Sequence, residues 1–286
     1  MPFAPAPLRD LAAPPLLWTR RAWLGGALAV ASGGALAQPV KPASAPASTA
    51  TRVPVLAYHR FGPTVADSMT VRTRTFAEHL HVIQDLGCTV IPLADLVAWR
   101  LGQLPSLPPR PVVVTVDDGH RSVIEAMAPM LRDPRWPVTL FIYPSAISNA
   151  RYAMRWEDLR ELQDTGHYAI ESHTYWHPHL VRERRQRTPE DFDRFARHQL
   201  SRAKTVLQER MGRPVTHLAW PFGMSDAGLQ ALAAQTGHAA AFGLGNRPAS
   251  LTDPVFDLPR YLMVDALGGR QMARLLQQAH SEETRS

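Results

Sequence analysis

The chain has 286 residues, of which 45% are hydrophobic, and its 31 Lys and Arg outnumber its 25 Asp and Glu, for a net charge of +6. This length and apolar content predict a globular protein with one main domain. The basic excess is mostly Arg and is interleaved with acidic residues at 182–187 and 194–202, which argues against a nucleic-acid partner. The only cysteine, Cys88, excludes an intrachain disulfide and is predicted to be a small buried residue.

Residues 1–37 have the features of an export signal. Arg20-Arg21 precede a short Gly-rich apolar stretch, and Ala35-Leu36-Ala37 is typical of a cleavage site. The arginine pair favours the twin-arginine route, and a general-secretion signal or an uncleaved anchor is the alternative. The stretch is too short to span a membrane comfortably, so we expect export to the periplasm or outside the cell and no stable membrane span after signal removal. Loss of the signal lowers the net charge to about +4, because it removes Arg9, Arg20, Arg21 and Asp10.

After the signal, residues 38–52 are rich in Pro, Ala and Ser and predict a flexible linker. From 53 to 286 the chain alternates strand-like and helix-like segments, which is typical of an α/β barrel and predicts one domain. Apolar, β-branched runs predict strands at 53–59, 88–92, 111–117, 138–143, 167–173, 216–221 and 238–243. Helical periodicity predicts helices at about 75–86, 93–101, 121–132, 156–165, 189–211 and 225–236.

Glycines at the ends of predicted helices support these boundaries. A glycine follows four of the predicted helices, at the position where helices commonly end: Gly87, Gly166, Gly212 and Gly237. The Arg-rich stretch 178–189 separates two predicted elements and is expected to be a loop beside the functional site.

Two short motifs carry the candidates for chemistry. Thr115-Val116-Asp117-Asp118-Gly119 ends one predicted strand, and His173-Thr174-Tyr175-Trp176-His177-Pro178 follows another. In a barrel the carboxyl ends of parallel strands share one face, so the motifs are expected to meet. Two imidazoles and one carboxylate suit a divalent metal and leave the second carboxylate free to act as a base. Taken alone, Asp-Asp-Gly is also a common turn, and a His pair is also found in surface patches.

The two motifs resemble the first two motifs of the polysaccharide deacetylase family, also called the NodB-homology or carbohydrate esterase 4 group. Those motifs read Thr-Phe-Asp-Asp-Gly and His-Ser/Thr-x-x-His-Pro, and the resemblance covers most of residues 53–265. It implies a distorted (β/α)7 barrel, with Asp117 as general base and Asp118, His173 and His177 as ligands of one divalent metal. Zn is the expected ion, and Co, Ni or Fe are alternatives because this ligand set suits them comparably.

The sequence departs from the family at its third motif. Residues 219–223 read Ala-Trp-Pro-Phe-Gly and have Ala219 where the family has the Arg that orients the base. Arg260 is the candidate to replace it, as the resemblance to the poly-β-1,6-N-acetylglucosamine branch implies. The alternative for Arg260 is a surface ion pair. The resemblance also assigns an oxyanion-binding backbone N–H to Phe222.

A second departure concerns the general acid. The family's fifth motif normally carries a His in this role, yet residues 262–267 contain none. His59, His179 and His238 are candidates that the sequence does not rank. Sugar-stacking candidates lie near the motifs, with rim or core packing as the alternative for each: Tyr143, Tyr175, Trp176 and Trp220, together with His59 as a further substrate contact.

Taken together, the residues and the resemblance predict an exported, metal-dependent N-deacetylase. The expected substrate is a polymer of N-acetylated amino sugars. Poly-β-1,6-N-acetylglucosamine is the expected polymer, since residues 53–62 are similar to the start of that branch. Peptidoglycan or chitin oligomers and O-acetyl esters are alternative substrates. A catalytically weak polysaccharide-binding module and an exported metal-binding structural protein are the other classes considered; Asp117 favours the enzyme, because binding alone needs no base. A partner protein that delivers the polymer during export is also expected.

Overall fold

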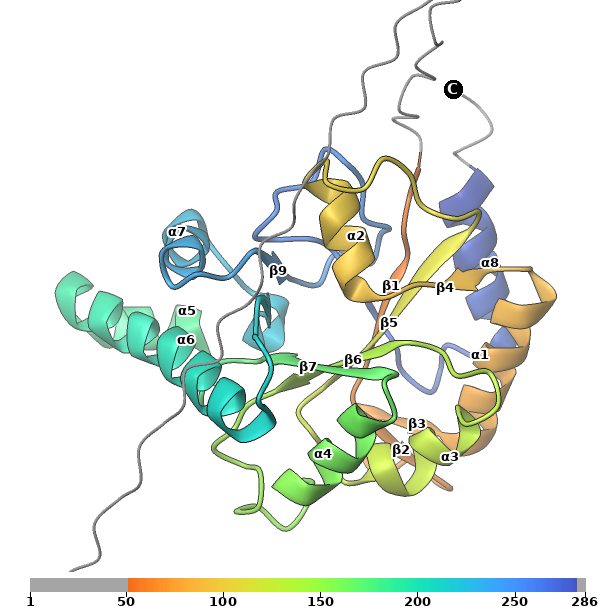
Figure 1. The fold of residues 1–286 in the computed structure, drawn as a ribbon, viewed down its shortest axis with the longest axis horizontal. Helices are drawn as coiled ribbons and strands as arrows, with labels where there is room; N and C mark the ends of the chain where they lie inside the picture. Colours follow the sequence, from red (N-terminus) through yellow and green to blue (C-terminus); the bar gives the residue numbers. More distant parts are fainter. Residues whose placement is uncertain (1–50, 282–286) are drawn as a thin grey trace, which may run out of the picture. The chain divides into compact units, whose positions relative to one another are not determined.

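A computed structural model describes residues 51–281, which fold around one curled parallel sheet (Figure 1). The predicted signal peptide 1–37 and most of the linker 38–52 lie outside the described residues. The strand order is β10-β1-β5-β6-β7-β8-β9, and β4 pairs with β5 as a branch. The bounds are β1 (Val55–Tyr58), β4 (Thr89–Val90), β5 (Pro111–Asp117), β6 (Val138–Ile142), β7 (Tyr168–Ser172), β8 (His217–Ala219), β9 (Ala240–Phe242) and β10 (Tyr261–Leu262).

Each of the seven predicted strands is present within its predicted range. The strand β5 is buried along its whole length, which agrees with its continuous apolar sequence and with a parallel strand covered on both faces. Three further strands were not predicted, because each has only two or three residues: β10 and the small parallel pair β2 (Arg60–Gly62) and β3 (Thr70–Arg72).

The segment 258–262 joins the two ends of the sheet. Its first part bonds to β9, through Leu258 N–H to the carbonyl of Ala241 at 2.9 Å and Gly243 N–H to the carbonyl of Leu258 at 2.9 Å. Its last part is β10, which pairs in parallel with β1. The sheet therefore curls into the distorted (β/α) barrel that the sequence predicts.

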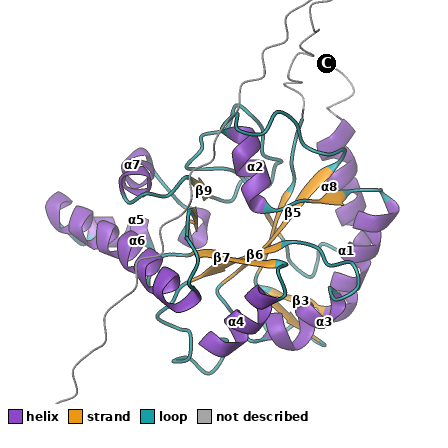
Figure 2. Cartoon of the chain, in the orientation of Figure 1, coloured by secondary structure: helices purple, strands orange, loops and turns teal. Residues whose placement is uncertain are grey.

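Helices surround the sheet (Figure 2). Five of the predicted helices are present close to their predicted bounds: α1 (Thr73–Asp85), α2 (Leu93–Arg100), α4 (Trp156–Asp164), α6 (Pro189–Met211) and α7 (Ala227–Gln235). The predicted helix 121–132 is instead a π-helical turn, η1 (Val123–Met127), followed by the short α3 (Ala128–Met130). All four predicted C-cap glycines have positive φ, including Gly212 at 65° after α6.

Two further expectations need correction, and one helix was not predicted. The loop predicted at 178–189 contains a helix, α5 (Leu180–Arg185), because Leu180 is buried and His179 accepts a hydrogen bond from the N–H of Arg182. A further helix, α8 (Gly269–Ser281), packs against α1 and buries Met272, Leu276 and Ala279. Cys88 is half-buried at the edge of the core rather than buried.

Three apolar clusters among the described residues hold the strands in place. One lies inside the curled sheet and includes Val113, Phe141 and Phe242. The other two lie between the sheet and the outer helices, one including residues of α1 and α4 and the other residues of α6 and α7. Within residues 51–281, no helix has the length and apolar character needed to cross a bilayer. The strands are thus rigidly supported, so that the loops at their carboxyl ends can carry function.

Candidate functional site

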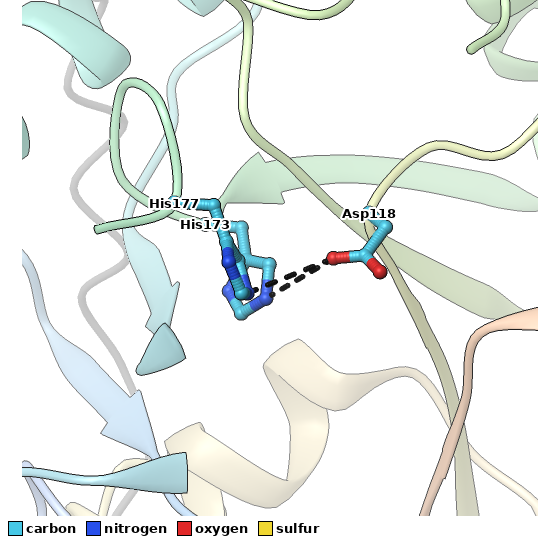
Figure 3. A group of neighbouring side chains, drawn as sticks. All are labelled: Asp118, His173 and His177. Atoms are coloured by element: carbon cyan, nitrogen blue, oxygen red, sulfur yellow. Dashed lines mark ion pairs between the residues drawn. The ribbon is translucent and has the colours of Figure 1, made fainter. Parts of the chain in front are cut away.

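The two motifs meet at the carboxyl ends of β5 and β7 (Figure 3). Asp117 is the last residue of β5 and Asp118 follows it, whereas His173 follows β7 and His177 lies four residues further on. The Oδ1 atom of Asp118 lies 3.7 Å from Nε2 of His173 and 3.7 Å from Nε2 of His177. The side chains that the sequence predicts as metal ligands are therefore brought together.

The chemistry of this group fits a divalent metal ion. One ligand atom from each of Asp118, His173 and His177 lies within 4.8 Å of the others. The Oδ1 atom of Asp118 is buried without a hydrogen-bond partner, although a buried carboxylate oxygen normally has one. The Nδ1 atom of His173 lies 2.8 Å from the carbonyl of Ala219, which can only accept, so Nδ1 carries the proton and Nε2 presents its lone pair.

The backbone is strained at two of the candidate metal ligands and at Phe222. Asp118, His177 and Phe222 have φ of 73°, 60° and 59°, a left-handed conformation that costs a non-glycine residue of order 1 to 3 kcal/mol. All three line one cavity of about 510 Å³. Strained residues cluster where function requires a particular direction of the side chain or backbone.

Asp117 is buried and held by Arg260. The guanidinium of Arg260 donates two hydrogen bonds of 2.8 Å, one to each carboxylate oxygen, and its Nε donates to the carbonyl of Gly243 at 3.1 Å. Burial alone raises the pKa of Asp117, but the charge of Arg260 and its hydrogen bonds outweigh burial, so the pKa lies below its ordinary value. Asp117 is thus an ionised acceptor at neutral pH.

Arg260 is 1% exposed and is not a surface ion-pair partner. It lies in the segment 258–262 that closes the sheet, which we call the seam segment. From there its guanidinium also donates a hydrogen bond to the hydroxyl of Thr115 on β5. The third-motif residue Ala219 contributes instead through its backbone, because its carbonyl orients the imidazole of His173.

The structure separates the three candidate acids. His59 directly follows β1, lines the cavity, and places Nε2 at 4.0 Å from Oδ2 of Asp117, while its buried Nδ1 has no hydrogen-bond partner. His179 caps α5 and stacks on Phe222 at 4.9 Å, beside the cavity. His238 precedes β9 and therefore lies at the opposite end of the strands, where burial lowers its pKa to about 4.

The predicted aromatic residues fall in different places. Trp220 is buried, donates to the carbonyl of Phe256 at 2.9 Å and forms a wall of the cavity. Tyr143 also lines it, with its ring centre 5.4 Å from that of His177. Trp176 lines a neighbouring cavity instead, and Tyr175 packs against His198 and lies under the guanidinium of Arg202.

Four residues of the cavity wall were not predicted from the sequence: Arg60, Met69, Leu244 and Leu262. Leu244 lies just beyond the predicted strand 238–243, so the rule that strand ends carry the site could have found it. Leu262 belongs to the unpredicted β10, and its place depends on the closure of the sheet.

The chain is similar to a known family over part of its length and to several solved structures over most of it. Residues 105–241 match the family model described as polysaccharide deacetylase. No curated protein matches the sequence significantly. Among the solved structures that share the fold is the deacetylase PplD of Streptococcus pyogenes in complex with acetate, with a TM-score of 0.70 and 17% identity over 79% of this chain and 98% of the other. A de-N-acetylase of Aggregatibacter actinomycetemcomitans has a TM-score of 0.69 and 20% identity over 78% of this chain and 99% of the other. IcaB of Ammonifex degensii has a TM-score of 0.69 and 22% identity over 79% of this chain and 97% of the other.

Proposed function

We propose that the chain is a metal-dependent N-deacetylase of a polymer of N-acetylated amino sugars, because residues 105–241 match the polysaccharide deacetylase family model. The observation that carries this proposal is a single cavity holding both a buried, Arg-bound carboxylate and the group Asp118, His173 and His177. A binding module needs a groove but no buried, ionised base beside a set of metal ligands.

In this proposal Asp118, His173 and His177 hold one divalent ion, with Zn as the expected metal and Co, Ni or Fe as alternatives. When bound, the ion polarises the acetyl carbonyl and makes a water molecule more acidic. Asp117 accepts the proton of the attacking water, and the two hydrogen bonds from Arg260 keep its carboxylate ionised and fixed in direction. The backbone N–H of Phe222 donates to the oxyanion that develops on the carbonyl oxygen.

The leaving amine needs a proton, and His59 is positioned to give it. Burial is the largest effect on His59 and lowers its pKa, whereas the carboxylates of Asp117 and Asp118 oppose it, so the imidazole starts neutral. Asp117 takes up a proton in the first step and lies 4.0 Å from Nε2 of His59, within reach through one water or a small side-chain movement. The proton that Asp117 removes from water can thus reach the amine through His59.

We further propose poly-β-1,6-N-acetylglucosamine as the polymer, with peptidoglycan or chitin oligomers as the alternative. The similarity of residues 53–62 to that branch supports this choice, and one of the structures that share the fold is a de-N-acetylase. The same proposal includes export by the twin-arginine route, based on Arg20-Arg21, and a partner protein that delivers the polymer. It includes neither a nucleic-acid partner nor a membrane span after signal removal.

The test is acetate release by the metal-reconstituted protein from β-1,6-linked and β-1,4-linked N-acetylglucosamine oligomers. Asp117→Asn should abolish release while metal and oligomer binding persist, and the exposed Asp164→Asn on α4 is the matched control. Higher activity on the β-1,6 oligomers supports the polymer. Tight binding without release would instead indicate a binding module, and no affinity for any sugar would indicate a metal-binding structural protein.

A further inference from the structure

A second cavity adjoins the candidate metal site. Its volume is about 410 Å³, and it shares Tyr143 and His177 with the first cavity, so a chain that passes through one can continue into the other. Its other side chains come mainly from the loop after β6. They include Ser145, Asn149, Tyr152 and Trp176.

The aromatic rings of this cavity are both exposed and firmly held. Tyr152 and Trp176 are 40% and 44% exposed, although large rings of this kind are usually more buried. Tyr152 stacks on His120, with ring centres 6.1 Å apart and planes at 10°, and its hydroxyl contacts that of Tyr143. Trp176 packs edge-on against Phe195. Rings held in this way offer a surface without a further cost of ordering.

The polar groups of the cavity are neutral. No Lys, Arg, Asp or Glu is among the described residues that line it. Asn149 donates to the carbonyl of Ser145 at 2.9 Å, and the amide and hydroxyl groups are suited to hydrogen bonding with sugar hydroxyls. Apolar ring faces beside uncharged hydrogen-bonding groups match a pyranose, whose C–H faces are apolar and whose edges carry hydroxyls. A peptide with free carboxylates would find no counter-charge here.

We propose that this second cavity binds a neighbouring sugar of the same polymer while the first cavity holds the acetylated sugar that reacts. The proposal rests on the proposed function and specifies its substrate as a neutral chain of at least two sugars. It assigns Tyr152 as a specificity-determining contact, since its ring belongs to the second cavity and does not line the first.

The experiment compares kcat and KM for acetate release from N-acetylglucosamine and its β-1,6-linked oligomers, using the metal-reconstituted full chain. For the unmodified protein, kcat/KM should rise from one sugar to two or three. Tyr152→Ala should lower the ratio of oligomer to monosaccharide kcat/KM by about five- to tenfold, mainly through KM, because one stacked ring is lost. Tyr152→Trp should restore the ratio. The control Leu101→Ala, 40% exposed on another surface segment, should leave it unchanged.

Two results would overturn the subsite: a kcat/KM that does not depend on chain length, or a Tyr152→Ala variant that loses activity equally on one sugar and on many. If no acetate is released from any substrate, the proposed function fails and binding by calorimetry decides the subsite. The subsite proposal would be supported if the protein binds oligomers more tightly than the monosaccharide and Tyr152→Ala removes that preference. Equal affinity for all chain lengths, or preference for an anionic muropeptide, would reject it.

Discussion

Arg260 and Asp117 form a two-pronged ion pair inside the barrel, with both hydrogen bonds at 2.8 Å, although 143 residues separate them in the chain. The pair links β5 to the segment that closes the sheet. The orientation of the Asp117 carboxylate, the proposed base, therefore depends on the segment that closes the sheet.

Arg260→Lys should keep the fold and lose most of the activity. Lysine preserves the charge but cannot donate in parallel to both oxygens, so we expect kcat to fall about 100-fold, comparable to the loss of one positioned catalytic contact. Arg260→Met should also lower the free energy of unfolding by about 3 to 5 kcal/mol, because it leaves a buried carboxylate unpaired. Kinetics and denaturant unfolding measure these effects. Arg197→Lys, in an exposed pair with Asp193, is the control, and an equal loss there would contradict the assignment.

Removal of the metal should abolish acetate release. Chelation is expected to leave an inactive protein that Zn restores, and His177→Gln should bind less than one equivalent of Zn, because one of three side-chain ligands is lost. Elemental analysis gives the stoichiometry. The exposed His81→Gln serves as control, and a His177→Gln variant with full metal content would rule out this ligand set.

His59→Gln should discriminate between substrates by their leaving groups. An amine must be protonated to leave, so loss of the acid should lower kcat for acetamides by about 100-fold or more. Acetate esters of 4-nitrophenol should lose much less, since the phenolate leaves unprotonated. His179→Gln, beside the cavity, is the matched variant. Equal losses on both substrates would show that His59 has another role.

Asp265 should make stability depend on pH. Its carboxylate accepts hydrogen bonds from the backbone N–H of Arg72 at 3.0 Å and from the hydroxyl of Thr75 at 2.8 Å, at the start of α1. Hydrogen bonding to the Arg72 side chain is the largest effect and lowers the pKa of Asp265 below its ordinary value. Because the pKa is lower in the folded state, the ionised carboxylate stabilises the fold at pH values above the unfolded-state pKa of about 3.9. This stabilisation is lost as the pH falls towards the folded-state pKa.

Asp265→Ala should accordingly lower the free energy of unfolding by about 1 to 2 kcal/mol at pH 7, the usual cost of losing such a helix-end contact. The difference from the unmodified protein should shrink below pH 4. Urea unfolding at several pH values measures it. Asp85→Ala, exposed at the other end of α1, should show little change, and a difference that persists at low pH would contradict the mechanism.

Features that depend on neighbours in the chain were predictable from the amino-acid sequence. Continuous apolar runs such as 111–117 specify strands, periodic segments such as 189–211 specify helices, and both agree with the structure because their signal is local. The same logic placed Asp117, Asp118, His173 and His177 at strand ends. Their roles remain predictions, but their proximity follows from the rule that parallel strands end at one face.

The distant residues that complete the site could not be identified before the fold was known. Arg260 replaces an absent motif residue because the seam segment bonds to β9 and then pairs with β1, and no local pattern encodes that closure. Of the three candidate acids, His59 is the one placed beside Asp117, because it follows β1 and β1 pairs with β5. The second cavity likewise joins the loop after β6 to the His motif after β7. Such contacts depend on strand order and on the curl of the sheet, whereas residue spacing reports only on near neighbours.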